Sequence, residues 1–236
     1  MDFGLELQIA LDRIELQKAL GLAQELADVA DIIEIGTSVI KSEGLRSVTA
    51  VKRILPTKML LADIKAVDGV EYELKSAFDA GADIATIMAW ADDDAIKMAL
   101  RVADQYRKSI MVDLLNVPDI ERRMNELVAL GVRVVCVHAS RTQEGYGLFA
   151  ELRSLYETST GRKKLDLRVA IAGKITVETL ADVSDTPPDI IIVGSAITRA
   201  PCPMEAAKKF RQAMARVTRH YIPGSAQEPQ VCLCCS

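Results

Sequence analysis

Hydrophobic positions along the chain follow two alternating patterns. Short apolar runs rich in β-branched residues are separated by longer amphipathic segments. Apolar runs of this length predict strands buried on both faces, and the longer segments predict helices. The predicted strands are residues 5–11, 32–35, 59–62, 84–88, 110–114, 132–137, 167–172 and 190–193. The pattern therefore predicts repeated strand–helix units around a parallel sheet.

The predicted helices lie between these strands and include residues 15–27, 69–80, 92–107 and 117–130. Glycine favours the position just past a helix end, and Gly81, Gly131 and the region of Gly161 stand at such positions. The acidic run 92–94 is typical of a helix start, where negative charge interacts favourably with the helix dipole.

Eight strand–helix pairs in 236 residues predict a single (β/α)8 TIM barrel over residues 1–218. The remaining tail, residues 219–236, contains prolines and a glycine and is predicted to be disordered. An open doubly wound sheet is the alternative, but it normally carries a glycine-rich turn after the first strand. Here that strand ends in Ala10-Leu11-Asp12-Arg13, which favours the closed barrel.

Composition and charge exclude several classes of partner. The net charge is -4, so the chain has no overall basic field to attract nucleic acid. No apolar run reaches the length of a membrane span, and the first residues lack the basic start and apolar middle of a signal peptide. We expect a cytoplasmic protein that binds neither membranes nor nucleic acid and captures any anionic ligand locally.

The five cysteines have different predicted roles. Cys136 lies in an apolar run and is expected in the core. Cys232, Cys234 and Cys235 crowd the C-terminus, where metal capture, lipidation and redox chemistry are all conceivable. Leu233 stands where prenylation requires the cysteine. A disordered appendage with exposed thiols is the favoured interpretation.

Polar residues end most of the predicted strands: Asp12, Glu34, Asp63, Lys65, Asp113 and His138, with Arg141 shortly after. In a (β/α)8 barrel, the carboxyl ends of the strands form the active site. A strand-end carboxylate can instead cap the next helix, and both interpretations stay open for Asp12 and Asp68. Capping does not explain Glu34, which precedes Ile35-Gly36, or Asp63, which precedes another apolar residue.

Carboxylates that converge at a barrel mouth repel one another unless cations lie between them. A bound divalent metal would balance the excess charge. Oxygen ligands such as Glu34 and Asp63 suit the hard cation Mg²⁺, and no Cys/His cluster for zinc stands at the strand ends.

The last two strands end in glycines, at Gly173-Lys174 and Gly194-Ser195. Loops after strands seven and eight often bind phosphate in this fold, although glycine is also common in ordinary turns. His138 closes a strand and is interpreted as a proton-transfer residue, with a core histidine as the alternative. The pattern does not decide whether Trp90 covers this site or only packs.

Several motifs resemble one enzyme superfamily, in order and over residues 5–210. They are residues 7–12 (LQIALD), 33–37 (IEIGT), 43–46 (EGLR), 61–65 (LADIK) with Asp68, 80–83 (AGAD), 112–117 (VDLLNV), 136–138 (CVH), 171–173 (IAG) and 192–194 (IVG). The chain resembles the orotidine-monophosphate-decarboxylase superfamily. Within it, the motifs are most similar to those of the 3-hexulose-6-phosphate synthases and their sister family, the 3-keto-L-gulonate-6-phosphate decarboxylases.

The resemblance implies roles for the residues at the strand ends. Glu34 and Asp63 look like the Mg²⁺ ligands, and Lys65 looks like the cation that stabilises an enediolate intermediate. Asp12 resembles a ligand of a substrate hydroxyl, and His138 resembles the proton-transfer residue.

The resemblance also implies a homodimer, in which Asp68 is similar to the residue that enters the neighbouring subunit's site. Gly173, Gly194 and Ser195 fall where the family holds the substrate's phosphate. Lys174 replaces the second glycine of the usual pair, and it either contacts the phosphate or points to solvent.

Two residues point to different members of this pair of families. Asp113 resembles the synthases, which implies condensation of formaldehyde with D-ribulose 5-phosphate. Arg141 resembles the decarboxylases, so decarboxylation of a β-keto acid sugar phosphate is the alternative. A non-catalytic sugar-phosphate-binding barrel is less favoured, because a protein without catalysis has no physical need for so costly a charge cluster.

Overall fold

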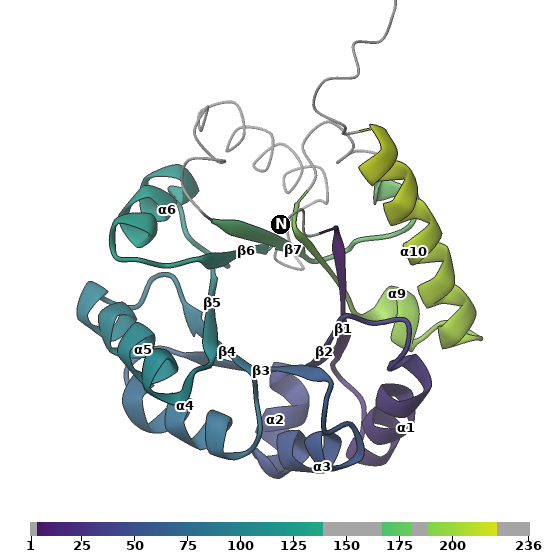
Figure 1. Ribbon diagram of the computed structural model, residues 1–236, viewed down its shortest axis with the longest axis horizontal. Coiled ribbons are helices and arrows are strands. Elements are labelled where there is room, and N and C mark those ends of the chain that lie inside the picture. The colour runs from purple at the N-terminus through teal and green to yellow at the C-terminus, as the bar shows by residue number, and fades with distance from the viewer. Residues whose placement is uncertain (1–3, 139–166, 181–187, 221–236) are drawn as a thin grey trace, which may run out of the picture.

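The predicted strands form a closed parallel barrel in the computed structural model, which describes residues 4–138, 167–180 and 188–220. Each strand pairs with the next in sequence, and the last pairs with the first (Figure 1). The strands are β1 (Glu6–Leu11), β2 (Ile32–Ile35), β3 (Met59–Ala66), β4 (Ile84–Met88), β5 (Ser109–Asp113), β6 (Val134–His138), β7 (Arg168–Ala172) and β8 (Ile190–Val193). The predicted (β/α)8 TIM barrel is confirmed.

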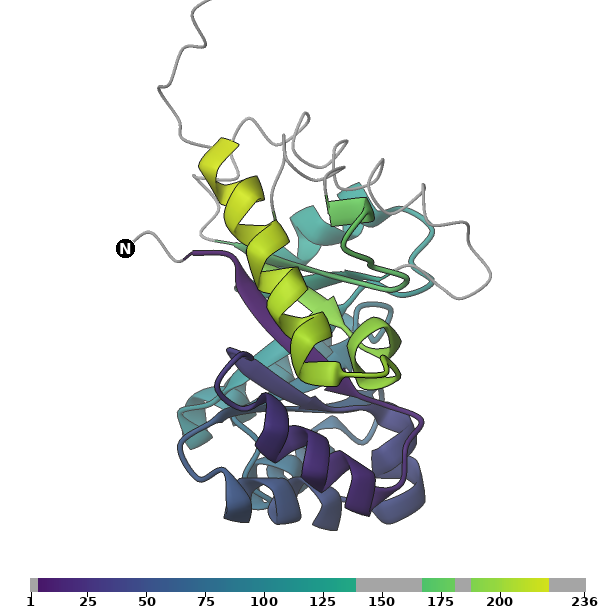
Figure 2. The same ribbon diagram turned by 90° about the vertical axis from the view of Figure 1, so that its right-hand side faces the viewer.

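The described helices lie outside the ring of strands (Figures 1 and 2). They are α1 (Leu16–Leu26), α2 (Thr37–Glu43), α3 (Arg46–Ile54), α4 (Val70–Asp79), α5 (Asp93–Tyr106), α6 (Ile120–Ala129), α9 (Ser195–Thr198) and α10 (Pro203–His220). Gly81 and Gly131 follow α4 and α6 with φ of 105° and 99°, so these predicted helix stops are confirmed. Asp92 caps α5 by accepting a hydrogen bond from the backbone N–H of Ala95 (2.7 Å).

Strand side chains alternate between two apolar layers. In β1, Leu7, Ile9 and Leu11 pack against the helices, whereas Ala10 faces the barrel interior. The interior cluster also contains Ile32, Leu61, Ile84, Met111, Cys136, Ala170, Ala172, Ile190 and Ile192. Burial on both faces explains the continuous apolar runs. The predicted core position of Cys136 is confirmed.

Strand β3 is longer than the predicted 59–62, because it continues through polar residues to Ala66. Its register with β4 shifts: Ala62 pairs with Ala85 and Ala66 pairs with Ile87. Four positions along β3 therefore match two along β4, as in a β-bulge. The prediction ended the strand where its apolar run ends, whereas the observed pairing depends on the neighbouring strand.

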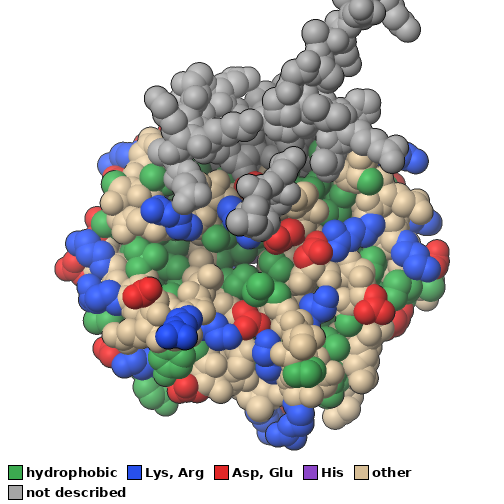
Figure 3. Space-filling view, in the orientation of Figure 1, with side chains coloured by type: hydrophobic (Ala, Val, Ile, Leu, Met, Phe, Trp, Pro, Cys, Tyr) green, Lys and Arg blue, Asp and Glu red, His purple; other side chains and the backbone are tan. Residues whose placement is uncertain are grey.

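Helix α10 continues to His220, past the predicted start of the tail at residue 219. Residues 221–236, which include the terminal cysteines, lie outside the described residues. In the part of the chain that is described, no helix is long and apolar enough to cross a membrane. On the face shown in Figure 3, acidic and basic side chains are interspersed around the described surface, as the small net charge leads one to expect.

Asp83 joins several elements at the amino-terminal end of the barrel. Its carboxylate accepts hydrogen bonds from Lys52 Nζ (2.7 Å), Lys108 Nζ (2.5 Å) and the backbone N–H of Leu60 (3.0 Å). Burial opposes the charge, but the hydrogen bonds from Lys108 and Lys52 lower the pKa of Asp83 below its ordinary value of 3.8. This carboxylate therefore connects α3, β3 and the start of β5.

We expect Asp83→Asn to lower the free energy of unfolding by about 1–3 kcal/mol, because two lysines lose their anionic partner. The folded-state pKa is lowered, so the stabilisation is present above pH 3.8 and is lost as the pH falls below it. Urea unfolding at neutral and acidic pH measures both effects. Asp94→Asn, which removes an exposed pair with Lys97, is the matched control and should change little. Equal stability of the two variants would contradict the prediction.

Candidate active site

Five of the predicted site residues line one cavity inside the barrel, near the carboxyl ends of the strands: Glu34, Asp63, Lys65, Asp113 and His138. Except for Lys65, each lies on the same face of its strand as an interior apolar residue two positions earlier, because such side chains share a face. The cavity measures about 30 Å³, which is enough for a water molecule or an ion. The structure thus brings these five side chains together.

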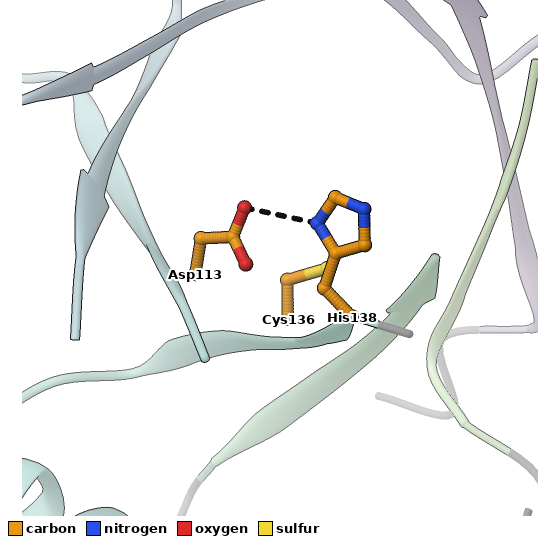
Figure 4. A group of neighbouring side chains, drawn as sticks. All are labelled: Asp113, Cys136 and His138. Atoms are coloured by element: carbon orange, nitrogen blue, oxygen red, sulfur yellow. Dashed lines mark hydrogen bonds and ion pairs between the residues drawn. The ribbon is translucent and has the colours of Figure 1, made fainter. Parts of the chain in front are cut away.

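A chain of charged contacts crosses this cavity. Lys65 Nζ lies 2.6 Å from Asp113 Oδ2 and 3.1 Å from Asp63 Oδ1. His138 Nδ1 lies 3.0 Å from the same Asp113 oxygen, and the two side chains point toward one another in Figure 4. Asp113 Oδ1 accepts a hydrogen bond from the backbone N–H of Leu115 (2.9 Å). Asp113 thus contacts both the lysine and the histidine.

The irregular part of β3 places Lys65 in the cavity. Lys65 has a positive φ of 51°, a conformation that non-glycine residues rarely adopt. The backbone N–H of Lys65 donates to Thr86 Oγ1 (2.9 Å), and Thr86 Oγ1 donates to Asp63 Oδ1 (2.9 Å). Thr37 Oγ1 donates to the other oxygen of Asp63 (2.5 Å). Backbone strain at a functional site is stable only when neighbouring contacts hold it, and these hydrogen bonds supply such contacts.

The charges in the cavity stabilise one another. Burial opposes the charge of Lys65, but Asp63 and Asp113 outweigh it and raise the pKa of Lys65. Burial also acts against ionised Asp113, yet the hydrogen bond and charge of His138, together with the charge of Lys65, lower its pKa to about 2. Lys65 and Asp113 are therefore both charged near neutral pH.

Glu34 is the exception, because its carboxyl group is buried and faces other acids. Burial, followed by the charge of Asp63, raises the pKa of Glu34 to about 8. Gln8 Nε2 donates to Glu34 Oε2 (2.6 Å). Within the described residues, the buried Oε1 of Gln8 has no hydrogen-bond partner. The site therefore combines excess acidic character with an unpaired acceptor.

These donors fit a hard divalent cation. Glu34 and Asp63 supply carboxylate oxygens, and a cation between them would stabilise the ionised form of Glu34. The orphaned Gln8 oxygen could accept a hydrogen bond from a water molecule on such an ion. The chemistry of this donor set agrees with the predicted ligand pair.

Asp12 and Asp68 take other partners. Asp12 Oδ1 accepts from the backbone N–H (3.1 Å) and the hydroxyl (2.6 Å) of Ser38 in the first turn of α2. A side chain at Gly36 would place its Cβ 2.7 Å from Asp12 Cβ, so this close approach requires glycine. Asp68 is exposed and accepts from the backbone N–H of Gly69 (2.7 Å). Neither residue lines the cavity.

The predicted phosphate residues follow β7 and β8, which are neighbours in the barrel. Gly173 has φ of 102°, a conformation that favours glycine. Lys174 and Ser195 are exposed, and Gly194 precedes the short helix α9. Arg141 lies outside the described residues.

Three further residues with polar or thiol side chains line the cavity and were not assigned to the site from the sequence: Gln8, Thr86 and Cys136. Strand alternation could have found Gln8 and Cys136, because each precedes an interior residue by two positions. Trp90 lies elsewhere, where it and Pro118 are among the residues that line a separate cavity of about 280 Å³. It is not among the residues that line the charged cavity.

The fold and this site define a (β/α)8 barrel with carboxylates, an ammonium group and an imidazole held together at the carboxyl ends of its strands. The sequence profile of the orotidine 5'-phosphate decarboxylase / HUMPS family matches residues 5–210. The chain therefore belongs to this family. The predicted resemblance and its extent are confirmed.

Comparison with individual proteins shows which members of the family this chain is similar to. A protein of Bacillus subtilis (strain 168) named 3-hexulose-6-phosphate synthase is 42% identical over 210 residues, covering 88% of this chain and 98% of the relative. The crystal structure of 3-hexulose-6-phosphate synthase from Salmonella typhimurium has a TM-score of 0.83 at 33% identity, covering 90% of this chain and all of that one. A 3-keto-L-gulonate-6-phosphate decarboxylase from Vibrio cholerae has a TM-score of 0.79 at 27% identity. The match covers 91% of this chain and 99% of the decarboxylase. Both of the predicted sister families are thus similar to this chain.

Proposed function

We propose that the protein is a 3-hexulose-6-phosphate synthase. It condenses formaldehyde with D-ribulose 5-phosphate reversibly, in the presence of Mg²⁺, to give D-arabino-hex-3-ulose 6-phosphate. The observation that carries this proposal is the contact of Asp113 with both Lys65 and His138. The 42% identity to a protein named for this activity supports it.

His138 is the proposed base. In the tautomer that carries its proton on Nδ1, His138 donates a hydrogen bond to Asp113, and Nε2 keeps its lone pair available. Nε2 takes a proton from C1 of ribulose 5-phosphate, and negative charge moves onto the substrate's oxygen. The resulting enediolate carbon forms a bond to the carbon of formaldehyde, whose oxygen accepts the proton back from the imidazolium.

Lys65 stabilises the oxygen that becomes negative. Asp63 and Asp113 hold its ammonium group in place before the reaction, so little reorganisation accompanies the charge transfer. Glu34 and Asp63 would hold Mg²⁺, which supplies further electrostatic stabilisation of that charge when bound. The carboxylates thus position both cations.

The phosphate and hydroxyl groups of the substrate would position the reacting carbon. We assign the phosphate to Gly173, Lys174, Gly194 and Ser195, where two neighbouring strands end and a lysine is exposed. Asp12 would bind a substrate hydroxyl, and its charge already acts on Glu34. Binding energy from these groups orients the substrate for attack.

A homodimer is part of the proposal. Asp68 is exposed on the loop after β3, where a neighbouring subunit can reach it. Its carboxylate would then complete the partner's site instead of its own. Sedimentation of the purified protein tests the assembly, and a monomer with full activity would contradict it.

Decarboxylation of 3-keto-L-gulonate 6-phosphate is the second candidate, supported by Arg141 and by the Vibrio cholerae structure. Proton NMR distinguishes the two activities. The protein is mixed with Mg²⁺ and either ribulose 5-phosphate and formaldehyde or 3-keto-L-gulonate 6-phosphate. Loss of formaldehyde coupled to a new hexulose phosphate supports the synthase. Consumption of the keto acid alone would replace the synthase proposal with the decarboxylase proposal. If neither mixture reacts, a non-catalytic binding barrel is favoured.

Mg²⁺ binding should release protons. The raised pKa of about 8 leaves Glu34 protonated in the metal-free protein between pH 4.5 and 8. A metal ligand must be deprotonated, so we expect release of about one proton per ion in this range and none at higher pH. Calorimetric titration in two buffers with different ionisation heats measures the number. Equal heats in the two buffers below pH 8 would contradict the prediction.

A further inference from the structure

Cys136 is a buried thiol that the proposed reaction does not use. It lies two residues before His138 on β6, and its backbone pairs with Asp113 on β5. One potential ligand atom from each of Asp113, Cys136 and His138 lies within 4.8 Å of the others. Figure 4 shows the sulfur beside the contact between the carboxylate and the imidazole.

These three side chains offer sulfur, nitrogen and oxygen donors. Such a mixture suits Zn²⁺ and Cd²⁺, which bind thiolates, better than it suits Mg²⁺. The Asp113 oxygen and His138 Nδ1 are 3.0 Å apart. Ligands on tetrahedral Zn²⁺, with bonds of about 2.0–2.3 Å, are separated by only slightly more, and the sulfur lies within 4.8 Å of both atoms.

We propose that Asp113, Cys136 and His138 form an inhibitory site for thiophilic divalent ions, separate from the Mg²⁺ site. Binding at this site is independent of the proposed function, and only its inhibitory effect rests on that function.

Binding of a thiophilic ion would remove one proton from the site and move another. The thiol releases its proton to solvent, and the imidazole proton moves from Nδ1 to Nε2 so that Nδ1 can bind the ion. Nε2 then carries a hydrogen and can no longer accept one from the substrate. The ion also takes the Asp113 oxygen that Lys65 contacts. The proposed base is therefore disabled, and the ammonium group of Lys65 loses one of the two carboxylates that hold it.

The surroundings explain why the site discriminates between ions. Burial, followed by the charge of Asp113, raises the pKa of the Cys136 thiol. The ammonium group of Lys65 also opposes a second cation nearby. A hard ion gains little from a protonated thiol, whereas a thiophilic ion forms a strong bond to the thiolate that offsets these costs.

Direct binding is tested on the full chain with Cys202, Cys232, Cys234 and Cys235 replaced by serine, so that one thiol remains. Cd²⁺ is titrated with Mg²⁺ in excess while the ultraviolet thiolate-to-Cd²⁺ charge-transfer absorbance is followed. We expect saturation at one ion per chain. Cys136→Val, which keeps a similar volume, should remove the band, and His138→Asn should weaken binding at least about tenfold.

Glu34→Gln is the matched control, since it alters the other carboxylate pair and should leave the band intact. No band, or a band that survives Cys136→Val or is unaffected by His138→Asn, would overturn the site. If Cys136→Val fails to fold, Cys136→Ala serves in its place.

Inhibition is measured with the same chains in the formaldehyde assay. Zn²⁺ should inhibit the one-thiol chain, and Cys136→Val should keep its activity and raise the inhibitory concentration at least about tenfold. Equal inhibition of both chains would overturn the inhibitory role. If neither chain turns over formaldehyde, the result counts against the proposed function. The absorbance titration then tests by itself whether the ion site exists.

Discussion

Replacing Lys65 with methionine should lower kcat by at least about 10²- to 10³-fold, the usual cost of removing one group that stabilises an oxyanion. Methionine keeps the length of the side chain but removes the charge that lies between Asp63 and Asp113. Negative charge on the substrate would then develop beside two carboxylates. The effect should fall on kcat more than on KM, because the lysine acts mainly on charge that appears during the reaction.

The same substitution should raise the pKa of Asp113, which loses one of the cations that lower it. Formaldehyde consumption measures the rate, and circular dichroism checks the fold. Lys75→Met is the matched control, because Lys75 pairs with Glu71 on the exposed face of α4 and is not among the residues that line the charged cavity. Activity of Lys65→Met within about tenfold of the unsubstituted protein would contradict the proposed role.

Replacing Glu34 with glutamine should stabilise the metal-free protein and abolish its response to Mg²⁺. Burial and Asp63 raise the pKa of Glu34 from 4.5 to about 8. Between these values, unfolding releases the Glu34 proton to solvent, so stability falls as pH rises. Above pH 8 the contribution levels off, and the total loss is about a few kcal/mol. Glutamine carries no ionisable proton and avoids this loss.

The local contacts allow the replacement. Gln8 Nε2 can donate to the amide oxygen of the new side chain as it does to Glu34 now. The uncharged amide would also escape the charge of Asp63, which disfavours ionised Glu34. We therefore expect the variant to fold.

Thermal unfolding in EDTA from pH 4.5 to 8 tests the prediction. The difference in stability between Glu34→Gln and the unsubstituted protein should grow with pH, and added Mg²⁺ should stabilise only the latter. Glu71→Gln, on the exposed face of α4, is the control and should follow the unsubstituted protein. A Glu34→Gln protein that is less stable at pH 8, or that still gains stability from Mg²⁺, would contradict the assignment.

The two substitutions show how the site combines stability and function. Lys65 and Asp113 stabilise each other's charge, so their pair is compatible with a stable fold. Among the described residues, the Gln8 amide is the one hydrogen-bond partner of the Glu34 carboxyl group, whose ionised form is unfavourable without a further cation. A costly buried acid of this kind is typical of a functional site.

Local sequence patterns determined the barrel. Apolar runs of the right length specify buried strands, and glycines such as Gly81 and Gly131 specify helix ends through their positive φ. The sequence also identified Glu34 and His138 as residues at the carboxyl ends of strands, because each stands where an apolar run ends. These are properties of neighbouring residues along one chain segment.

The tertiary structure alone decided which polar residues meet. The irregular pairing of β3 with β4 lets the strand continue past Ala62 and places Lys65 beside Asp113, a residue 48 positions away. Asp68, from the same motif, faces solvent instead. Asp12 binds Ser38 at the start of a helix that follows the next strand. Register and long-range hydrogen bonds depend on how separate strands pack, and the pattern within one strand does not contain that information.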